Sequence, residues 1–170
     1  MIMDDGVTTC LEPGHYLMPT TTGGAAAVMG WMDRWLQTDW PQLQVFLTSV
    51  PDHWSVMSVA GPRSSQLLEG LGCDFDLGGA AFPFMSMREG SVAGIRARVS
   101  RISFSGELAF EVSVDANSGL ALWEAVMEAG HRFDITPYGT EAMHVLRAEK
   151  GYVIVGQDTD GSVTPIDLGM

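Results

Sequence analysis

The stretch over residues 101–114, RISFSGELAFEVSV, constrains the fold of this chain more than any other. Ser105, Gly106 and Glu107 supply a turn, and residues 108–114 are apolar and β-compatible enough to continue as a strand. Alternation along that strand divides its side chains between two faces, with Phe110, Val112 and Val114 opposite Ala109, Glu111 and Ser113. One face is therefore predicted to pack on a core, and the other to carry a carboxylate.

Glu111 rises from the middle of this predicted strand. A carboxylate there can accept hydrogen bonds from two adjacent N–H groups of a planar ligand, because its two oxygens lie in one plane. Charged residues on strands also commonly face solvent with no partner. From the residues alone, ligand recognition and simple solvation both stay open for Glu111.

Composition predicts a folded, acidic protein. The chain has 170 residues, 46% of them hydrophobic, which suffices for one domain or for two tightly joined halves. Its formal net charge of -12, with only nine Lys and Arg, argues strongly against a nucleic-acid or anionic-membrane surface, since both need a cationic footprint. Four of the nine cations cluster in one stretch and leave a local anion site open: Arg88, Arg96, Arg98 and Arg101.

Cysteine spacing, hydropathy and missing catalytic motifs further restrict the classes of protein to which this chain can belong. Cys10 and Cys73 show no metal-ligand or CxxC spacing, so we expect free thiols, packed inside, in a reducing cytoplasm. No apolar run approaches the ~20 residues of a membrane helix, and the start lacks signal-peptide features, so a cytoplasmic location is expected. Phosphate loops, nucleophile elbows and zinc motifs are also missing, and no metal site is predicted.

The first half of the chain predicts a mixture of strands and helices. A hairpin is expected at the start, with its turn at residues 12–15. A helix over residues 25–37 places apolar side chains on one core-facing stripe: Val28, Trp31, Met32, Trp35 and Leu36. Residues 44–50 and 54–60 then suggest a strand pair, followed by a short helix after Pro62 with Leu67 and Leu68 inward.

The second half continues the mixture. We expect a strand that turns at Glu89 and Gly90, and a long or interrupted strand over residues 91–105. After the stretch described first, the expected elements are a helix over residues 118–129 with Leu122, Trp123, Val126 and Met127 inward, a short strand at 133–136 and a helix at 139–150. Strict βα alternation is missing, so the fold class is α+β with mostly antiparallel sheets.

Two adjacent acids near the start, Asp4 and Asp5, form a second candidate site. On a strand they point to opposite faces and cannot form a dyad, but one of them could face a cavity. A carboxyl group buried there could stabilise a cation or take up a proton. Two solvated acids are the alternative.

Five segments in fixed order carry a family resemblance: MDDG, VAGPRSSQLL, FPFM, RISFSGELAFEV, and HVLRAEKG followed by GQDTD. Through them the chain resembles the folate-binding module of the aminomethyltransferase family, which includes the glycine-cleavage T-protein and dimethylglycine oxidase. It is most similar to the C-terminal region of the alpha subunit of heterotetrameric sarcosine oxidases. The segments are individually weak, but their order and spacing are specific.

The resemblance assigns roles to particular residues. It implies that Glu111 binds the pterin edge of tetrahydrofolate, and that Asp5, not Asp4, lies near the folate nitrogens that receive the one-carbon unit. Phe104 stands where the T-protein motif usually has Tyr, so a hydroxyl contact is missing there. Arg101 and Arg147 match family arginines, for which structural ion pairing and folate contact both stay open.

The resemblance also implies a reaction and partners. Oxidised sarcosine would give its one-carbon unit to tetrahydrofolate, forming 5,10-methylenetetrahydrofolate, within an enzyme whose flavin and NAD sites lie outside this chain. The expected partners are flavin-containing and other sarcosine oxidase subunits, or a second copy through an exposed sheet edge. Residues 1–170 would be a folate-binding domain truncated at both ends. An aminomethyltransferase of the glycine-cleavage type and a non-catalytic interaction domain are the alternatives.

Overall fold

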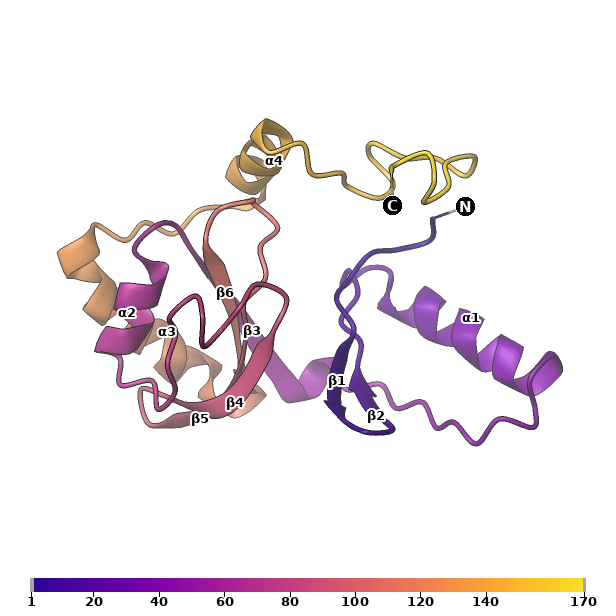
Figure 1. The fold of residues 1–170 in the computed structure, drawn as a ribbon, viewed down its shortest axis with the longest axis horizontal. Helices are drawn as coiled ribbons and strands as arrows, with labels where there is room; N and C mark the ends of the chain where they lie inside the picture. Colours follow the sequence, from indigo (N-terminus) through magenta and orange to yellow (C-terminus); the bar gives the residue numbers. More distant parts are fainter. Residues whose placement is uncertain (1, 170) are drawn as a thin grey trace. The chain divides into compact units, whose positions relative to one another are not determined.

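The computed structural model describes residues 2–169, which divide into two compact units. Unit 1 comprises residues 1–49 and 153–170, and unit 2 comprises residues 50–152. Helices and antiparallel sheets occur in the same chain, which confirms the α+β class (Figure 1). None of the helices among the described residues is long and apolar enough to cross a membrane.

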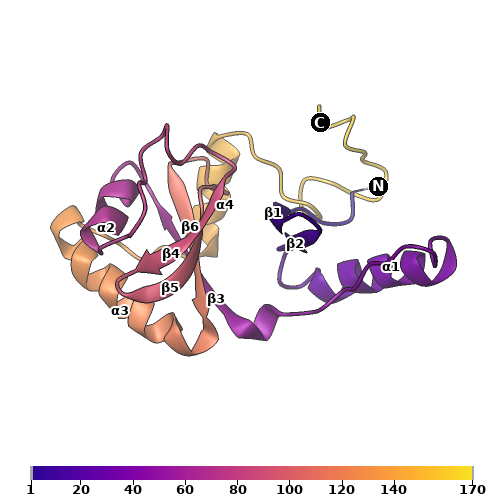
Figure 2. The same ribbon diagram turned by 60° about the horizontal axis from the view of Figure 1, so that its bottom comes forward.

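Unit 2 is built on a four-stranded antiparallel sheet in the order β3-β6-β5-β4. Its strands are β3 (Trp54–Ala60), β4 (Met87–Val92), β5 (Ile95–Ser100) and β6 (Ala109–Asp115). Its helices are α2 (Ser64–Gly70), α3 (Gly119–Gly130) and α4 (Thr140–Glu149), with 3-10 turns at Pro51–His53, Ala116–Ser118 and His131–Phe133. Both ribbon views show α2 and α3 on the same side of the sheet (Figures 1 and 2).

The core of unit 2 lies between that side of the sheet and the two helices. The predicted apolar face of β6 is confirmed, because Phe110, Val112 and Val114 are fully buried. The helices contribute residues that were also expected inward: Leu67, Leu68, Leu122 and Val126. Trp123 and Met127 were expected there too, but Trp123 is 44% exposed and Met127 is only partly buried.

Unit 1 contains the predicted hairpin and helix but has no closed core. The hairpin consists of β1 (Thr9–Glu12) and β2 (His15–Leu17), and the helix is α1 (Ala25–Thr38). The apolar stripe of α1 was expected to be buried, yet α1 has no buried residue. Trp31 and Trp35 of the helix make aromatic contacts, with Trp31 edge-on to Trp35 and Trp35 stacked on Trp40, which follows the helix.

Several expected strands are wrong, and local backbone geometry explains why. Residues 44–50 form no strand, since the chain enters a 3-10 turn at Pro51 and β3 takes β6 as its partner. The turn expected at Glu89 and Gly90 lies instead at Ala93 and Gly94, which have successive positive φ values of 53° and 74°. Residues 133–136 do not extend because Asp134 is left-handed, with φ 57°.

Two further expectations need correction. The first strand starts at Thr9, so Asp4 and Asp5 lie in an irregular segment before it. The strand over residues 91–105, expected as long or interrupted, is the interrupted alternative: Ser91 and Val92 end β4, and β5 spans Ile95–Ser100. Both cysteines are free, but Cys10 is exposed and not packed inside, whereas Cys73 packs partly against the core.

Candidate functional site

Glu111 lies at the middle of β6, which is an interior strand of the sheet. Its side chain is on the face opposite the core, as the alternation predicted. Directly across the ladders, Ser58 of β3 and Ser100 of β5 are its partners, so the three side chains share one face. The carboxylate is therefore flanked by two small hydroxyl side chains.

Glu111 is a partly buried acid without an internal partner. Among residues 2–169 it makes no hydrogen bond or ion pair through its carboxylate, and burial raises its pKa. By contrast, Glu107, four residues earlier, is paired with Lys150 at 3.0 Å from carboxylate oxygen to Nζ. Desolvating a carboxylate costs free energy, and no described residue compensates that cost at Glu111 with a hydrogen bond or ion pair.

Arg101 holds the loop before β4 against the end of β5. Its guanidinium donates to the carbonyl of Phe82 at 2.5 Å, and its backbone N–H donates to the carbonyl of Ser86 at 2.9 Å. Its carbonyl accepts from the N–H of Met85 at 2.9 Å. These contacts are structural and involve carbonyl groups.

Arg147 and Phe104 lie outside the strands of the unit 2 sheet, in α4 and in the connection between β5 and β6. Arg147, in the last turn of α4, donates from its guanidinium to the carbonyl of Tyr152 at 2.9 Å and so fixes the chain after the helix. Phe104 is partly buried in the connection between β5 and β6. In the predicted turn after it, Gly106 has a φ of 80° and its N–H donates to the Ser103 hydroxyl at 2.9 Å.

The two acids near the start of the chain have different surroundings. Asp4 accepts hydrogen bonds from Thr21, through the N–H at 3.3 Å and the hydroxyl at 2.9 Å, and from the N–H of Asp5 at 2.8 Å. Asp5 is exposed as a whole, and a hydrogen bond from its own backbone N–H acts to lower the pKa of its carboxyl group. Partial desolvation, followed by the charge of Asp4, raises the Asp5 pKa. Asp4 is therefore engaged by Thr21 and by the backbone of Asp5, whereas the role of Asp5 stays a prediction.

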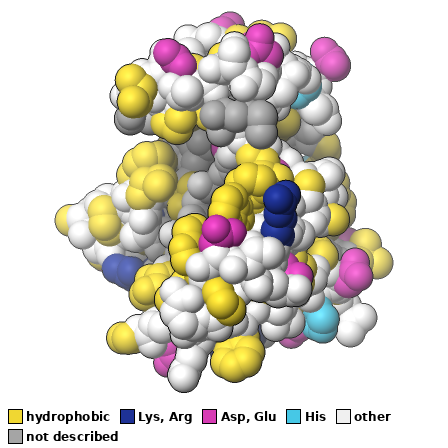
Figure 3. All heavy atoms as spheres, turned by 90° about the vertical axis from the view of Figure 1, so that its right-hand side faces the viewer, with side chains coloured by type: hydrophobic (Ala, Val, Ile, Leu, Met, Phe, Trp, Pro, Cys, Tyr) yellow, Lys and Arg dark blue, Asp and Glu magenta, His cyan; other side chains and the backbone are white. Residues whose placement is uncertain are grey.

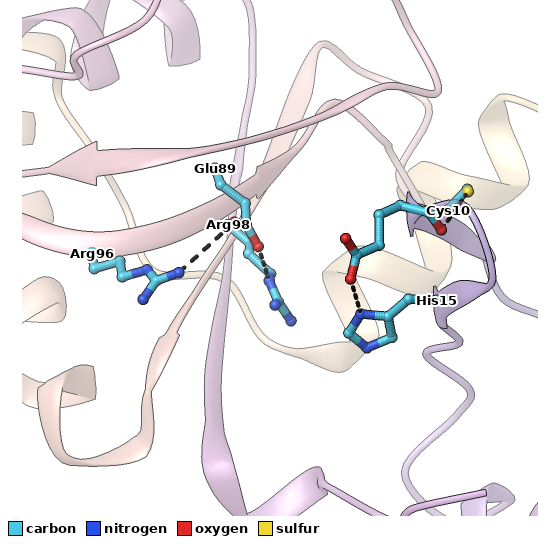
Figure 4. Close-up of polar contacts among 6 residues, drawn as sticks. Cys10, His15, Glu89, Arg96 and Arg98 are labelled. Atoms are coloured by element: carbon cyan, nitrogen blue, oxygen red, sulfur yellow. Dashed lines mark hydrogen bonds and ion pairs between the residues drawn. The ribbon is translucent and has the colours of Figure 1, made fainter. Parts of the chain in front are cut away.

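The arginine cluster is engaged in internal contacts. Arg98 donates to Glu89 at 2.6 Å, and Arg96 reaches the same carboxylate at 3.9 Å (Figure 4). The Arg98 guanidinium also lies over the Trp54 ring. Arg88 donates to the carbonyls of Met87 and Ala81. The space-filling view shows hydrophobic and acidic side chains with few Lys or Arg among them (Figure 3). The geometry gives no support to the local anion site.

Four of the predicted site residues, Glu111, Phe104, Arg101 and Arg147, belong to unit 2, whereas Asp5 belongs to unit 1. Sequence reasoning missed Ser58 and Ser100 as neighbours of Glu111, because strand register determines which residues lie opposite. It also missed Thr21 as the partner of Asp4, a contact across 17 residues. The serines in WSVMSVA and RARVS were visible, but no local signal linked them to Glu111.

Comparison with known proteins places this geometry in a family. The model of the GCVT N-terminal domain matches residues 1–170. The chain belongs to the GCVT N-terminal domain family. The family resemblance inferred from the five segments is thereby confirmed.

Individual relatives extend this result. The chain is 56% identical to the sarcosine oxidase subunit alpha of Corynebacterium sp. (strain U-96), matching 100% of this chain and 18% of that protein. It is 27% identical to the aminomethyltransferase of Halothermothrix orenii, over 99% of this chain and 45% of the relative. It is 29% identical to human mitochondrial dimethylglycine dehydrogenase, over 94% of this chain and 18% of that protein. This chain thus spans less than half the length of each of these relatives.

Proposed function

We propose that this chain is the tetrahydrofolate-binding part of a sarcosine oxidase alpha subunit, in which Glu111 holds the pterin edge. The observation that carries the proposal is the unpartnered, partly buried carboxylate of Glu111 in the middle of a sheet. A pterin edge offers a ring N–H beside an amino group, which matches the two coplanar acceptors of a carboxylate. The Glu111 carboxylate, which makes no hydrogen bond or ion pair with a described residue, is free to accept from that partner.

The remaining residues have supporting roles in this proposal. Asp5 would lie near the folate amine and stabilise the positive charge that develops during one-carbon transfer. Tetrahydrofolate would supply the nucleophilic amine that accepts the one-carbon unit. Phe104 would offer the pterin an apolar ring, while Arg101 and Arg147 would maintain the loops through their carbonyl contacts.

The relatives favour sarcosine oxidase over the glycine-cleavage reaction, given 56% identity against 27%. We propose that oxidised sarcosine supplies the one-carbon unit and that 5,10-methylenetetrahydrofolate is the product. Flavoprotein and other sarcosine oxidase subunits would be the partners, and the location would be cytoplasmic. On this proposal residues 1–170 form one folate-binding module within a longer polypeptide.

Calorimetric titration with tetrahydrofolate tests the assignment of Glu111. Glu111→Gln is expected to weaken binding by about 1–3 kcal/mol, roughly 5- to 150-fold in Kd, because a charge-assisted acceptor is lost. Glu107→Gln is the matched control, since that acid pairs with Lys150 and should leave Kd unchanged. Equal affinity of Glu111→Gln and the wild type rules out the pterin assignment. No binding by the wild-type chain favours the non-catalytic interaction domain.

Asp5 is tested in the enzyme assembled with its flavoprotein subunits. Asp5→Asn is expected to slow methylenetetrahydrofolate formation about 10²-fold or more, because transition-state charge loses its partner, while tetrahydrofolate still binds. Asp4→Asn should slow the reaction much less, since its carboxylate already serves Thr21. An unchanged rate in Asp5→Asn excludes Asp5 from the transfer step.

A further inference from the structure

Ser58 of β3 and Ser100 of β5 both lie across the ladders from Glu111, but the two pairs differ in kind. The N–H of Gly61 donates to the carbonyl of Leu108 at 2.8 Å, which makes these two residues a hydrogen-bonded pair. Pairs alternate along an antiparallel ladder, so Ser58 and Glu111 form a non-hydrogen-bonded pair, with Cα atoms about 4.5 Å apart. Ser100 is then the hydrogen-bonded partner, at about 5.5 Å. The register therefore brings the side chain of Ser58 close to the Glu111 carboxylate.

The side chains of this row have no partners of their own. Ser58 is exposed and Ser100 is partly buried, and neither hydroxyl makes a hydrogen bond within residues 2–169. The carboxylate of Glu111 is likewise unpaired among these residues. A hydroxyl donates as well as accepts, whereas an ionised carboxylate only accepts. The row therefore suits a ligand edge on which one acceptor lies beside two donors.

The neighbours of Glu111 on this face of the sheet are small. Ala109 and Ser113 lie two positions before and after it on β6, and the two serines lie beside it on the adjacent strands. All of these neighbours are Ala or Ser, whose side chains rise little above the sheet. A flat ring can therefore lie along the face with its edge against the Glu111 carboxylate.

The two sides of Glu111 differ in the space that they offer. Beyond Ser100 the row continues on β4 with the longer side chain of Met87, whereas beyond Ser58 the sheet ends. Ser58 also lines a groove of about 780 Å³ at the β3 edge. Ligand atoms beside the Glu111 carboxylate thus have open space over Ser58 rather than over Ser100.

We propose that Ser58 determines ring specificity in the pterin site: its hydroxyl donates to the ring carbonyl next to the N–H that Glu111 binds. A pterin edge presents a carbonyl oxygen, a ring N–H and an amino group in that order. Ser58 and Glu111, on adjacent strands about 4.8 Å apart, present a donor followed by two acceptors, which is the complementary order. This inference rests on the proposed function and adds to it the residue that recognises the carbonyl.

Calorimetric titration of the whole chain with tetrahydrofolate gives the first test. Ser58→Ala is expected to raise Kd about 3- to 10-fold, the loss of one neutral hydrogen bond. Ser58→Thr keeps the hydroxyl and should bind more tightly than Ser58→Ala. Ser100→Ala is the matched control on the other side of Glu111 and should leave Kd unchanged. The urea midpoint of Ser58→Ala should equal that of the wild type, because the exposed hydroxyl has no internal partner.

The same titrations separate this inference from the folate proposal. An unchanged Kd in Ser58→Ala, while Glu111→Gln weakens binding, overturns the role of Ser58 and leaves the pterin assignment standing. A loss of affinity in Ser100→Ala but not in Ser58→Ala has the same meaning, because the carbonyl then lies on the β5 side. An unchanged Kd in Glu111→Gln, or no binding by the wild type, overturns both proposals.

Infrared difference spectroscopy tests the hydrogen bond itself. Tetrahydrofolate labelled with ¹³C at the ring carbonyl is bound to each variant, and the carbonyl stretch of the bound ring is measured. A donated hydrogen bond weakens the C=O bond, so the stretch is expected at lower wavenumber in the wild type and in Ser100→Ala than in Ser58→Ala. A stretch at the same wavenumber in the wild type and in Ser58→Ala overturns the proposal, even if Kd differs.

Discussion

At the residue scale, the partly buried carboxylate of Glu111 lowers the stability of the unit 2 sheet. Burial raises the pKa of Glu111, and no donor among the described residues compensates it. A group whose pKa is raised on folding stabilises the folded state at low pH, and this contribution is lost as pH rises through the folded-state pKa. At neutral pH the ionised Glu111 therefore disfavours folding, as acids kept for a ligand commonly do.

The variant Glu111→Gln should reveal this cost. At pH 7 to 8 we expect its free energy of unfolding to exceed that of the wild type by about 0.5–2 kcal/mol, because the buried charge is removed. The gain should shrink as pH falls towards the usual range of a carboxyl pKa, where the wild-type side chain becomes neutral. Urea unfolding at several pH values measures it. A gain independent of pH would show that charge is not the cause.

At the element scale, β6 is the central organiser of unit 2. It pairs with β3 along its whole length and with β5 on its other side. Its two faces have different surroundings, since Val112 is fully buried in the core whereas Glu111 and Ser113 lie on the opposite face. The alternation of side chains thus joins a packing surface and a candidate binding surface in one strand.

Paired substitutions on β6 test this division. Val112→Ala is expected to lower the free energy of unfolding by about 2 kcal/mol, because two buried methyl groups are lost and a cavity is left. Ser113→Ala, on the neighbouring residue and the other face, should change it by less than about 0.5 kcal/mol. Chemical denaturation of both variants gives the comparison. Equal losses would contradict the assignment of faces.

At the scale of the whole molecule, the hydrophobic core belongs to unit 2 alone. Among residues 2–169, every buried hydrophobic side chain lies within residues 59–126, and the buried side chain in unit 1 is that of Thr159. Local stability follows buried apolar contacts. The hairpin and α1 of unit 1 must therefore rely on backbone hydrogen bonds and the Trp31, Trp35 and Trp40 contacts.

Native-state hydrogen exchange should separate the two units. Amides of α1 are expected to open with free energies of about 0–2 kcal/mol, whereas those of β6 should approach the global value of about 5 kcal/mol or more. The β1–β2 hairpin should behave like α1 because it has no buried side chains either. Protection of α1 equal to that of β6 would indicate that unit 1 is covered in solution.

Some features were determined by the sequence itself. Period-two alternation over residues 109–115 was sufficient to place Glu111 opposite the core, because successive strand side chains must point to opposite faces. The helices at Ala25–Thr38, Gly119–Gly130 and Thr140–Glu149 were likewise predictable from periodicity and terminal glycines. The ordered segments also identified the family correctly.

Only the tertiary structure decided pairing and partners. Residues 44–50 have a strand-like sequence and were expected to pair with residues 54–60. In the structure β3 pairs with β6 instead, because strand pairing depends on packing between segments distant in the sequence. The same long-range contacts placed Ser58 and Ser100 beside Glu111 and brought Thr21 into hydrogen-bonding contact with Asp4. Alternation along a chain fixes which way a side chain points, but only the folded arrangement fixes what it meets.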